Sequence, residues 1–364
     1  MLAPLRKFLL PIAALSAVAA SPATAATLGD PNLGLQVMRE YNLVVLGNLN
    51  SGSNVEGRTF VGGNLTGNSS DYYKTNGKAM APSTAPGLTV VGNVTGGTKN
   101  LQNGSGALIG GNLTSGLNLN GQNHNVTIGG NAKDINGSSG STIRIGGNAT
   151  GNMNKNGATI TSNTNLGSFV GDLQVQATDY AMGVKGLSAY LADLDATDTI
   201  TFPLSNRVQF KPTTVGNIAV FDLANTDVFN KVGEMQFLAG AYDTIIVNVG
   251  GTAASLTKNF IGNNSGLGQH VIWNFYEAQT INFSGSFYGS VLAPYAAATN
   301  NNFIEGSAVF GSLNQNGEIH LGAYNGGLKV LSAVPEPATW AMMIVGFGLA
   351  GSMIRRRNRQ LLAA

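Results

Sequence analysis

The segment ALIGGNLTSG, from Ala107 to Gly116, is one of five related phrases in the first half of the chain. The others are TFVGGNLTG (59–67), TVVGNVTG (89–96), VTIGGNAKD (126–134) and TIRIGGNATG (142–151). Their Gly-Asn pairs set a period, because Asn93, Asn112 and Asn131 are nineteen residues apart and Asn148 follows after seventeen. Repeats of this length are typical of a solenoid, in which each repeat packs on its neighbours.

Each phrase predicts a short strand followed by a corner. Residues such as Thr127 and Ile128 favour a strand, and the Gly-Gly-Asn that follows can adopt the positive φ of a turn. Stacked about 4.8 Å apart, such coils would bury Ile and Val and align the asparagines into a hydrogen-bonded ladder. Asn64 precedes Asn93 by twenty-nine residues, which indicates a polar insertion at 68–87. The predicted fold is an all-β β-solenoid, or β-helix, with coils of about 17–20 residues and repeat positions at Asn64, Asn93, Asn112, Asn131 and Asn148.

One helix is predicted in the mature chain, at about residues 172–195. Apolar residues from Leu173 to Leu194 recur at helical spacing along one face. A single amphipathic helix in a β chain is expected to flank the solenoid and cover an apolar face or edge. Strand patterns resume afterwards, which favours one discontinuous solenoid over two domains; they lie at 200–202, 208–210, 218–222, 244–249, 270–276 and 280–283.

The N-terminus has the pattern of a secretory signal peptide. Arg6 and Lys7 precede an apolar run at 8–20, and the small residues Ala23, Ala25 and Ala26 mark the processing site. We therefore expect residues 1–26 to form a signal helix that signal peptidase removes. Export across the inner membrane follows from this prediction.

The C-terminus combines a proline-rich hinge, an apolar run and a basic stop. Pro335, Glu336 and Pro337 precede Trp340, and the apolar run ends at Arg355-Arg356-Arg357. The run at about 338–354 predicts a transmembrane helix near the lower length limit for a bilayer, with its arginines on the cytoplasmic side. An ordinary membrane anchor is one interpretation of this tail.

The order of these residues resembles the PEP-CTERM sorting signal of Gram-negative bacteria. That resemblance covers residues 331–364 and implies that an exosortase cuts near Pro-Glu-Pro and discards the helix. It also implies an exported protein of a bacterium that makes extracellular polysaccharide. The membrane attachment would then be transient, and the mature protein would be displayed at the cell surface or released.

Composition excludes several classes of function. The two ends carry six of the twenty basic residues and one of the eighteen acidic ones, so the net charge changes from +2 to −3 when they are removed. The basic whole chain is therefore no evidence for a nucleic-acid partner. Cysteine is absent, which excludes disulfides, thiolate metal sites and a cysteine nucleophile.

The central part of the chain resembles the choice-of-anchor A domain of bacterial surface proteins. The matching phrases span about Leu33 to Gly327, within a predicted domain of 27–330; they are YNLVVLGNLNSGSNVEGRTFVGGNLTG (41–67), GLSAYLADL (186–194), VIWNFYEAQTI (271–281), GSVLAP (289–294) and GEIH (317–320). The layout is also similar, more weakly, to bacterial ice-binding β-solenoids with a helix alongside. The resemblance implies an adhesin-like surface protein, and it supplies no catalytic residues.

An enzyme is the first alternative, because some β-helices degrade polysaccharides. Glycoside chemistry needs two carboxylates at a fixed separation, and the repeats from Leu88 to Ile160 contain only one acid, Asp134. Glu318 and His320 would share a strand face, as would Glu56 and Arg58, and Glu305 lies in a similar phrase. We expect these five residues to form structural ion pairs or ligand contacts. No metal or cofactor is expected.

Ice binding is the second alternative. Thr66, Thr95, Thr114 and Thr150 occupy one repeat position, but Lys133 interrupts the row. A row broken by a charge is more typical of a hydrogen-bonded corner than of a surface that matches a lattice. The sequence thus predicts a non-catalytic surface or extracellular-matrix protein that functions in adhesion or in association with exopolysaccharide and biofilm. It leaves the ligand, the oligomeric state and the final attachment open.

Overall fold

The structure is a computed structural model that describes residues 28–213, 217–238 and 242–330. The predicted signal peptide with Ala23, Ala25 and Ala26 lies outside these residues. So do the sorting motif (Pro335, Glu336, Pro337, Trp340 and Arg355–Arg357) and the predicted transmembrane helix. Within the described segments, every helix is too short or too polar to cross a membrane.

The described chain forms a solenoid whose coils have three faces, built almost entirely from parallel strands. The first, which we call the helix-covered face, is the longest sheet. In its N-terminal half it contains β1 (Leu43–Val45), β3 (Thr59–Val61), β6 (Leu88–Val90), β8 (Ala107–Ile109), β10 (Asn125–Ile128), β12 (Thr142–Ile145) and β14 (Thr159–Thr161). In its C-terminal half it contains β17 (Ile218–Leu223), β19 (Thr244–Val249), β22 (Val271–Asn274) and the first parts of β25 (Ser290–Asn300) and β27 (Ala308–Gln315).

The second face we call the Asn/Thr face. It contains β2 (Leu49–Ser51), β4 (Leu65–Thr66), β20 (Ala253–Leu256), β23 (Thr280–Phe283) and the last parts of β25 and β27. Single parallel bridges continue it from Leu65 through Val94 and Leu113 to Ala132.

The third face contains two parallel sheets joined by bridges at Val55. One sheet consists of β5 (Ser70–Tyr72), β7 (Lys99–Leu101), β9 (Leu117–Leu119), β11 (Ala132–Asn136) and β13 (Ala149–Asn154), and the other of β24 (Phe287–Tyr288), β26 (Ile304–Glu305) and β28 (Ile319–His320). The first residues of β11 and β13 lie on the Asn/Thr face, and only their last parts belong to the third face. A four-stranded sheet at the far end of the C-terminal half is made of β15 (Thr201–Leu204), β16 (Arg207–Phe210), β18 (Glu234–Phe237) and β21 (Asn259–Ile261).

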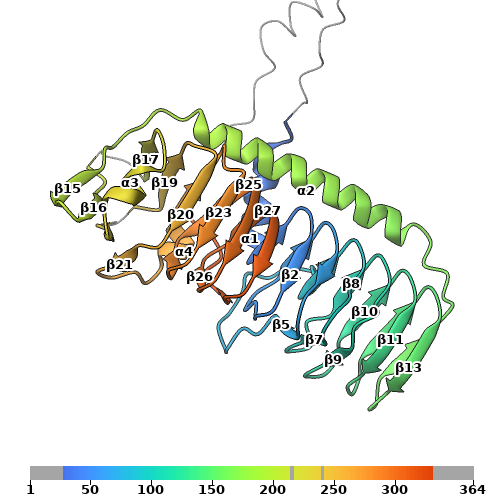
Figure 1. Cartoon of the computed structure of the whole chain (residues 1–364). Coiled ribbons are helices and arrows are strands. Elements are labelled where there is room, and N and C mark those ends of the chain that lie inside the picture. Colours follow the sequence, from blue (N-terminus) through green and yellow to red (C-terminus); the bar gives the residue numbers. More distant parts are fainter. Residues whose placement is uncertain (1–27, 214–216, 239–241, 331–364) are drawn as a thin grey trace, which may run out of the picture.

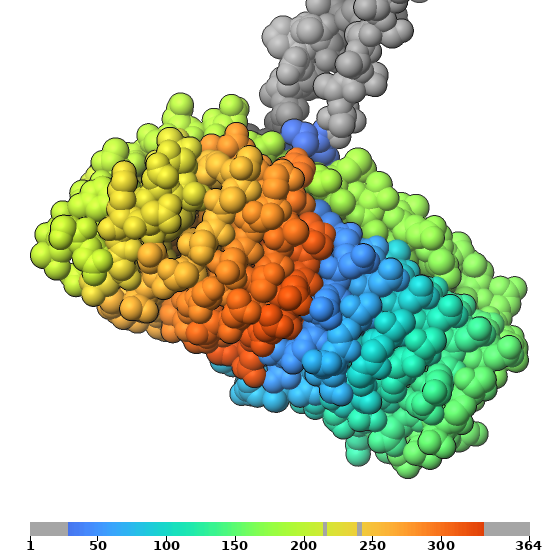
Figure 2. Space-filling model, in the orientation of Figure 1, coloured from blue at the N-terminus to red at the C-terminus, as the bar shows by residue number. Residues whose placement is uncertain are grey.

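The chain enters the solenoid in the middle. From β1 it winds outward to β14, and a long helix then carries it back along the molecule to β17 (Figure 1). From there it winds inward until β27 pairs with β1, with Leu43 opposite Ala308. Figure 2 shows the two halves abutting without a break in the surface. The expected discontinuous solenoid is therefore one continuous stack closed by a seam between β1 and β27.

The core differs between the two halves. In the N-terminal half, aliphatic side chains at matching positions stack from coil to coil, as Val90, Ile109, Ile128 and Ile145 do, all with no exposed surface. In the C-terminal half the interior is aromatic, and the Trp273 ring contacts Phe210 and Phe287 edge-on or tilted. Because each coil alone would expose its apolar side, this stacking is what stabilises the fold.

Two long helices cover the first face, which corrects the prediction of a single helix. α2 (Phe169–Ala192) is the predicted one, shifted by a few residues, and it runs along the length of the solenoid (Figure 1). α1 (Pro31–Glu40) starts where the Asp30 side chain accepts a hydrogen bond from the Asn32 N–H. An N-cap aspartate followed by proline is a helix-start signal that the sequence carried. The short helices α3 (Asp227–Lys231) and α4 (Leu267–His270) complete the described set, and α4 takes His270 out of the strand expected there.

The glycines directly before the ladder asparagines act by close approach, not by the positive φ that we expected. None of the glycines that directly precede Asn64, Asn93, Asn112, Asn131 and Asn148 has positive φ, whereas Gly67, Gly96 and Gly151 at the ends of three phrases do. A Cβ on Gly129 would lie 2.2 Å from the carbonyl oxygen of Gly110 and 2.7 Å from Cγ2 of Val170 in α2. Any side chain here would force coils and helix apart, so glycine is required for the stacking.

The polar insertion at 68–87 is also only partly an insertion. Its start contains β5, whose residues pair with β7 and continue the third face. The irregular loop is therefore limited to about residues 73–87.

Candidate functional site

The repeated asparagines form a ladder along the rim of the Asn/Thr face. The backbone N–H of Asn93 donates to Oδ1 of Asn64 at 2.8 Å, and the same bond joins Asn112 to Asn93, Asn131 to Asn112 and Asn148 to Asn131. The ladder begins one coil earlier, because Asn64 donates to Oδ1 of Asn48. Each side-chain carbonyl is thus occupied by the next coil, and the amide Nδ2 groups of Asn93, Asn112 and Asn131 face outward without an acceptor among the described residues.

A second row of side chains runs beside this ladder, two residues further along each coil. The hydroxyls of Thr66, Thr114 and Thr150 lie within 3.5 Å of carbonyl oxygens of the preceding coil. Such a bond uses the hydroxyl hydrogen and leaves the oxygen lone pairs directed outward. The expected corner column is therefore present, and it offers acceptors beside the asparagine donors.

Both rows continue across the seam into the C-terminal half, where the sequence lacks the Gly-Asn phrase of the repeats. The strand registers align one outward position per coil in each row. The asparagine row consists of Ala253, Thr280, Ala297, Ser312, Asn48, Asn64, Asn93, Asn112, Asn131 and Asn148. The threonine row consists of Ser255, Asn282, Thr299, Asn314, Asn50, Thr66, Thr95, Thr114, Lys133 and Thr150. At about 4.8 Å per coil the rows are roughly 45 Å long. Lys133 is the one charged residue in either row, so the face is long, flat, polar and nearly neutral.

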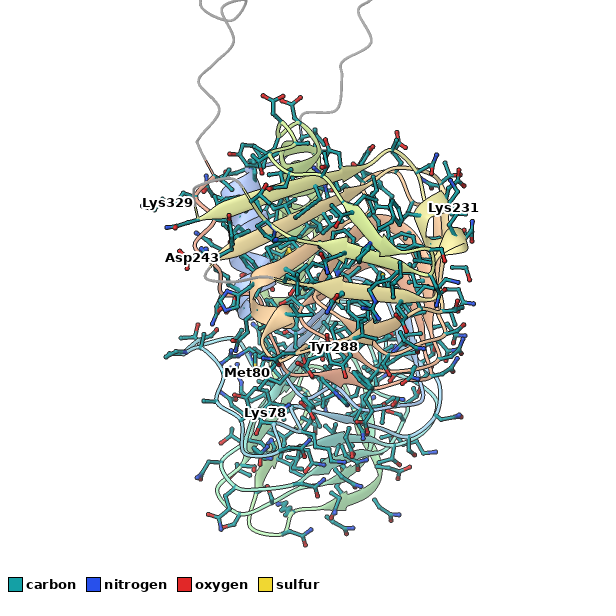
Figure 3. All side chains as sticks on the ribbon, turned by 90° about the vertical axis from the view of Figure 1, so that its left-hand side faces the viewer. Lys78, Met80, Lys231, Asp243, Tyr288 and Lys329 are labelled. Carbon is teal, nitrogen blue, oxygen red and sulfur yellow. The ribbon has the colours of Figure 1, made fainter. Side chains whose placement is uncertain are left out.

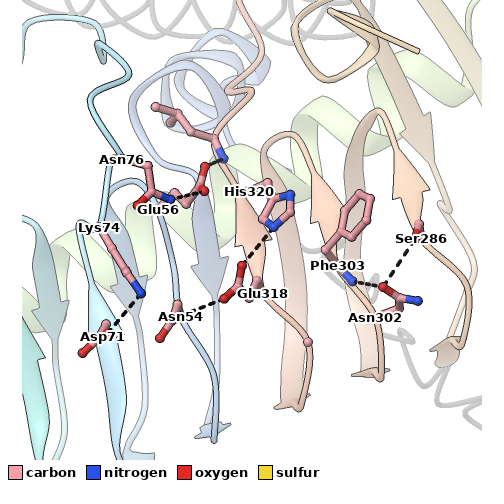
Figure 4. A network of polar contacts seen from close by, with 12 residues as sticks. Asn54, Glu56, Asp71, Lys74, Asn76, Ser286, Asn302, Phe303, Glu318 and His320 are labelled. Atoms are coloured by element: carbon pink, nitrogen blue, oxygen red, sulfur yellow. Dashed lines mark hydrogen bonds and ion pairs between the residues drawn. The ribbon is translucent and has the colours of Figure 1, made fainter. Parts of the chain in front are cut away.

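The third face carries a compact polar network at the seam (Figure 4). Nε2 of His320 lies 3.0 Å from Oε2 of Glu318, whose other oxygen accepts a hydrogen bond from Nδ2 of Asn54 at 2.8 Å. The His320 ring is stacked on Phe303, with 4.5 Å between the ring centroids. Glu305 is opposite His320 in the register of β26 and β28. The network thus ties the first and last coils together across the seam.

Glu56 and Arg58 do not pair with each other, which corrects one expected ion pair. Glu56 is nearly buried, and its carboxylate accepts hydrogen bonds from Asn76, from Lys78 and from the Leu321 N–H at 2.7 Å. Burial alone would raise the pKa of Glu56, but these hydrogen bonds outweigh burial and hold the pKa below its ordinary value.

Arg58 holds the same loop from the other side. Its guanidinium donates to the carbonyl oxygens of Ala81 and Ala85 and lies 5.8 Å from the centroid of the Tyr73 ring. Together, Glu56 and Arg58 fix the loop at 73–87 across the seam. Both residues therefore have an architectural role in the described structure.

This loop covers a cavity of about 460 Å³. Its lining includes Lys78 and Met80 of the loop, which are labelled in Figure 3, together with Arg39, Gln269, Tyr324 and Asn325. Two of the five guanidinium N–H groups of Arg39 are already used, because its Nη2 donates to the carbonyl oxygens of Gly326 and Leu328. Arg39 therefore holds the last described residues against α1 as well as lining the cavity.

Comparison with protein families adds two matches to this geometry. Residues 34–321 match the model described as "Putative Ice-binding-like adhesive domain". The chain belongs to this ice-binding-like adhesive domain family. Residues 333–357 match the PEP-CTERM protein-sorting motif, which confirms the resemblance of the tail. An adhesive domain followed by this motif describes an exported surface protein.

Other comparisons add little. No curated protein matches the chain. Among solved structures, an ice-binding protein from an Antarctic Flavobacteriaceae bacterium is similar over 84% of this chain and 100% of its own, with 12% identity and a TM-score of 0.27. A TM-score this low is too weak to carry over any property of that protein. The choice-of-anchor A name remains a prediction.

The acidic and histidine side chains of the described residues do not gather into a metal-binding group. Among these residues there is no group of three or more His, Asp or Glu side chains close enough to hold a metal ion. The strand register places Glu305 opposite His320. His320 contacts Glu318, and Glu318 also accepts a hydrogen bond from Asn54. The arrangement is suited to holding coils together.

Sequence reasoning missed two members of the site. Asn48 starts the ladder, and its phrase LGNLNSG is a shortened copy of the repeats with one glycine before the asparagine. Asn42, directly before β1, has no exposed surface and joins both halves through its side chain. A lone asparagine outside the repeated phrase gives no periodic signal, so only the structure could identify it.

Proposed function

We propose that this adhesive domain is non-catalytic and binds extracellular polysaccharide through the Asn/Thr face. The observation that carries the proposal is the length and neutrality of the two polar rows. They offer amide and hydroxyl groups in register over roughly 45 Å, with the continuous run of asparagine amides in the N-terminal half. This arrangement suits repeated contacts with a polymer of hydroxyl-bearing sugars. Many weak contacts along one chain reinforce each other without any deep pocket.

We further propose that signal peptidase and an exosortase process the chain on its way to the surface. The PEP-CTERM match supports the sorting step, and the membrane attachment would then be transient. Mass spectrometry of the mature C-terminus tests this step. A mature chain that still carries Trp340 to Arg359 would mean that the tail is retained as an anchor. An exosortase gene beside a polysaccharide cluster in the source genome would support the sorting step.

A pair of matched double variants tests the binding face. Thr95→Lys with Thr114→Lys adds two charges on adjacent coils of the Asn/Thr face. Thr142→Lys with Thr159→Lys makes the same change on adjacent, exposed positions of the helix-covered face. We expect retention on immobilised exopolysaccharide from the source bacterium to fall at least tenfold for the first variant and to stay unchanged for the second.

Three other outcomes would contradict the proposal in different ways. Equal retention of both variants would exclude the Asn/Thr face, and no retention of the unmodified protein would exclude the ligand class. Release of new reducing ends from the polymer would instead indicate a polysaccharide-active enzyme, since a non-catalytic domain leaves the polymer intact.

Ice binding is a second candidate, favoured by the same flat face and by the description of the family. The distinguishing measurement is thermal hysteresis of the purified protein. Lys133 projects into the threonine row, and the Thr66, Thr114 and Thr150 hydroxyls are directed at backbone carbonyls. We therefore expect no thermal hysteresis, and a clear freezing-point gap lost in the Thr95/Thr114 variant would favour ice.

A further inference from the structure

A hollow of about 320 Å³ lies between the C-terminal end of α2 and the adjacent corner of the solenoid. Its walls contain two tyrosine rings and one carboxylate; the lining residues are Ser188, Ala189, Ala192, Asp193, Tyr276 and Tyr295. The hollow is separate from the cavity under the loop at 73–87, and it contains none of the charged residues of the third face.

The two tyrosines occupy the same corner on neighbouring coils. Asn274 of β22 is opposite Leu292 of β25, and a tyrosine follows each of them within three residues. On the next coil this corner is formed by Gly311, which packs against backbone atoms of residues 294–296. The coils of Tyr276 and Tyr295 therefore carry an aromatic ring where the next coil has Gly311. The rings add exposed contact surface at this corner, whereas Gly311 allows close backbone packing.

The rings of Tyr276 and Tyr295 are not part of the buried hydrophobic core. Tyr295 is 39% exposed, and the Lys185 ammonium lies 5.4 Å from its ring centroid, which restrains the ring. The hydroxyl of Tyr276 reaches the neighbouring corner at Gly250. An exposed, restrained tyrosine offers a large contact area at a small cost in conformational entropy.

The helix wall of the hollow is rigid. Oγ of Ser188 donates to Oδ1 of Asn274 at 2.7 Å, and Nδ2 of Asn274 donates back to the Ser188 carbonyl. Nδ2 of Asn248 donates to the Leu191 carbonyl at 2.7 Å, and both asparagines are buried. These bonds fix α2 at this point, so the hollow is already formed before any ligand binds.

The charges around the hollow select among ligands. Burial raises the pKa of Tyr276, and the nearby carboxylates of Glu277 and Asp222 raise it further. Asp193 adds a third exposed carboxylate. A carboxylate accepts hydrogen bonds from hydroxyl groups but repels anions. The carboxylates of Asp193, Asp222 and Glu277 outnumber the ammonium group of Lys185 beside Tyr295, so the local field disfavours acidic sugars such as uronates.

We propose that this hollow binds a neutral sugar residue of a polysaccharide, with the tyrosine rings against its C–H surface and Asp193 accepting from its hydroxyls. The volume is at the small end of the range for ligand sites and fits a short stretch of sugar rings. The same coils continue directly into the Asn/Thr face, since Thr280 and Ala297 follow Tyr276 and Tyr295 within four residues. The polymer can therefore pass from the hollow onto the long rows. The inference rests on the proposed polysaccharide binding and identifies the hollow as the place where the polymer is held most tightly.

Isothermal titration of the full chain in detergent with cellohexaose, chitohexaose and hexagalacturonate tests the inference. We expect heat with at least one neutral hexamer and weaker or no binding of the acidic one. Tyr276→Ala and Tyr295→Ala should each raise Kd at least tenfold, whereas Tyr295→Trp should retain binding because it keeps an aromatic surface. Asp193→Asn should weaken binding, and Asp179→Asn, an exposed change on the same helix, should not.

The outcomes separate the inference from the proposed function. No heat with either neutral hexamer, or tighter binding of hexagalacturonate, overturns the inference. If the tyrosine variants bind exopolysaccharide normally while Thr95→Lys with Thr114→Lys loses it, the hollow is not a sugar site and the Asn/Thr face stands alone. Unchanged circular dichroism and melting temperature of Tyr276→Ala and Tyr295→Ala show that any loss is not due to unfolding.

Discussion

Asn42 is expected to be the polar residue on which the seam between the two halves depends most. Its Nδ2 donates to the Gly306 carbonyl at 2.7 Å and to the His320 carbonyl at 3.0 Å, both in the C-terminal half. Its Oδ1 accepts from the Gly57 N–H at 2.9 Å, in the N-terminal half. Asn42 has no exposed surface, so water does not replace these bonds in the folded state.

The cost of Asn42→Ala follows from the groups that it would leave without partners. The His320 carbonyl keeps its bond from the Gly306 N–H, whereas the Gly306 carbonyl and the Gly57 N–H lose the side-chain partner that they share. Each buried, unsatisfied backbone group costs about 1–3 kcal/mol. We therefore expect the free energy of unfolding to fall by about 2–6 kcal/mol, a large share of the about 5–15 kcal/mol typical of a domain.

Urea unfolding measures this change with two probes. In a Trp340→Phe background the fluorescence of Trp273, buried in the C-terminal half, reports that half, and far-ultraviolet circular dichroism reports both. Asn314→Ala is the matched control, because it removes an exposed asparagine that accepts one hydrogen bond from Asn50. The control should change stability by less than about 0.5 kcal/mol. If Asn42→Ala costs no more than Asn314→Ala, the seam does not depend on these hydrogen bonds.

Three further perturbations test other parts of the structure. Ile128→Asp puts a carboxylate into the aliphatic stack and should abolish cooperative unfolding, whereas Ile128→Val should lower the free energy of unfolding by only about 0.5–1.5 kcal/mol. Unchanged cooperativity of the Asp variant would contradict the inward position of Ile128. Burial lowers the pKa of Lys99 to about 8. Between that pH and about 10.4, the ordinary pKa of lysine, the unfolded chain binds a proton at Lys99 that the folded chain does not. The free energy of unfolding should therefore rise with pH across this range by up to about 3 kcal/mol. Lys99→Met should remove that rise in pH-dependent denaturation and Lys155→Met, at an exposed site, should keep it; a rise that survives Lys99→Met would assign it to another group. Because the chain has no cysteine, one introduced cysteine can be labelled selectively. Thr114→Cys should react with a membrane-impermeant maleimide on intact cells faster than Thr178→Cys on the outer side of α2, and equal rates would contradict attachment by the helix-covered side.

The N-terminal half could be predicted from sequence because each repeat contains the residues that determine its strand and its corner. A strand, a glycine corner and an asparagine recur at nearly constant spacing, and parallel stacking of equal coils then fixes the register of the ladder. The reason assigned to the glycines was wrong, however. Positive φ and close approach both require glycine, and a sequence alone does not distinguish a backbone that turns from a backbone that is crowded.

The C-terminal half and the seam were less accessible to sequence reasoning. There the interior is filled by aromatic rings of different sizes around Trp273, so the coils vary and only GSVLAP (289–294) and EGSAVFGS (305–312) resemble each other. The seam joins residues such as Asn42 and Gly306, which are 264 positions apart, and no local pattern indicates such a contact. The partner of Glu56 was missed for a similar reason, since Lys78 lies in an irregular loop whose path depends on the folded coils.

The placement of the chain ends gives the three faces different roles. A Cβ on Gly186 of α2 would lie 2.1 Å from the Gly29 carbonyl, so the first described residues lie directly on this helix. At the other end, Arg39 of α1 binds the carbonyls of Gly326 and Leu328, which places the last described residues beside α1. The sorting motif begins at residue 333, only three residues after Val330. Attachment through the tail would therefore hold the molecule by its helix-covered side, where α1 and α2 already bury the outer apolar residues of the sheet. The Asn/Thr face has no such cover, so this attachment would leave its two polar rows free for a polymer to bind.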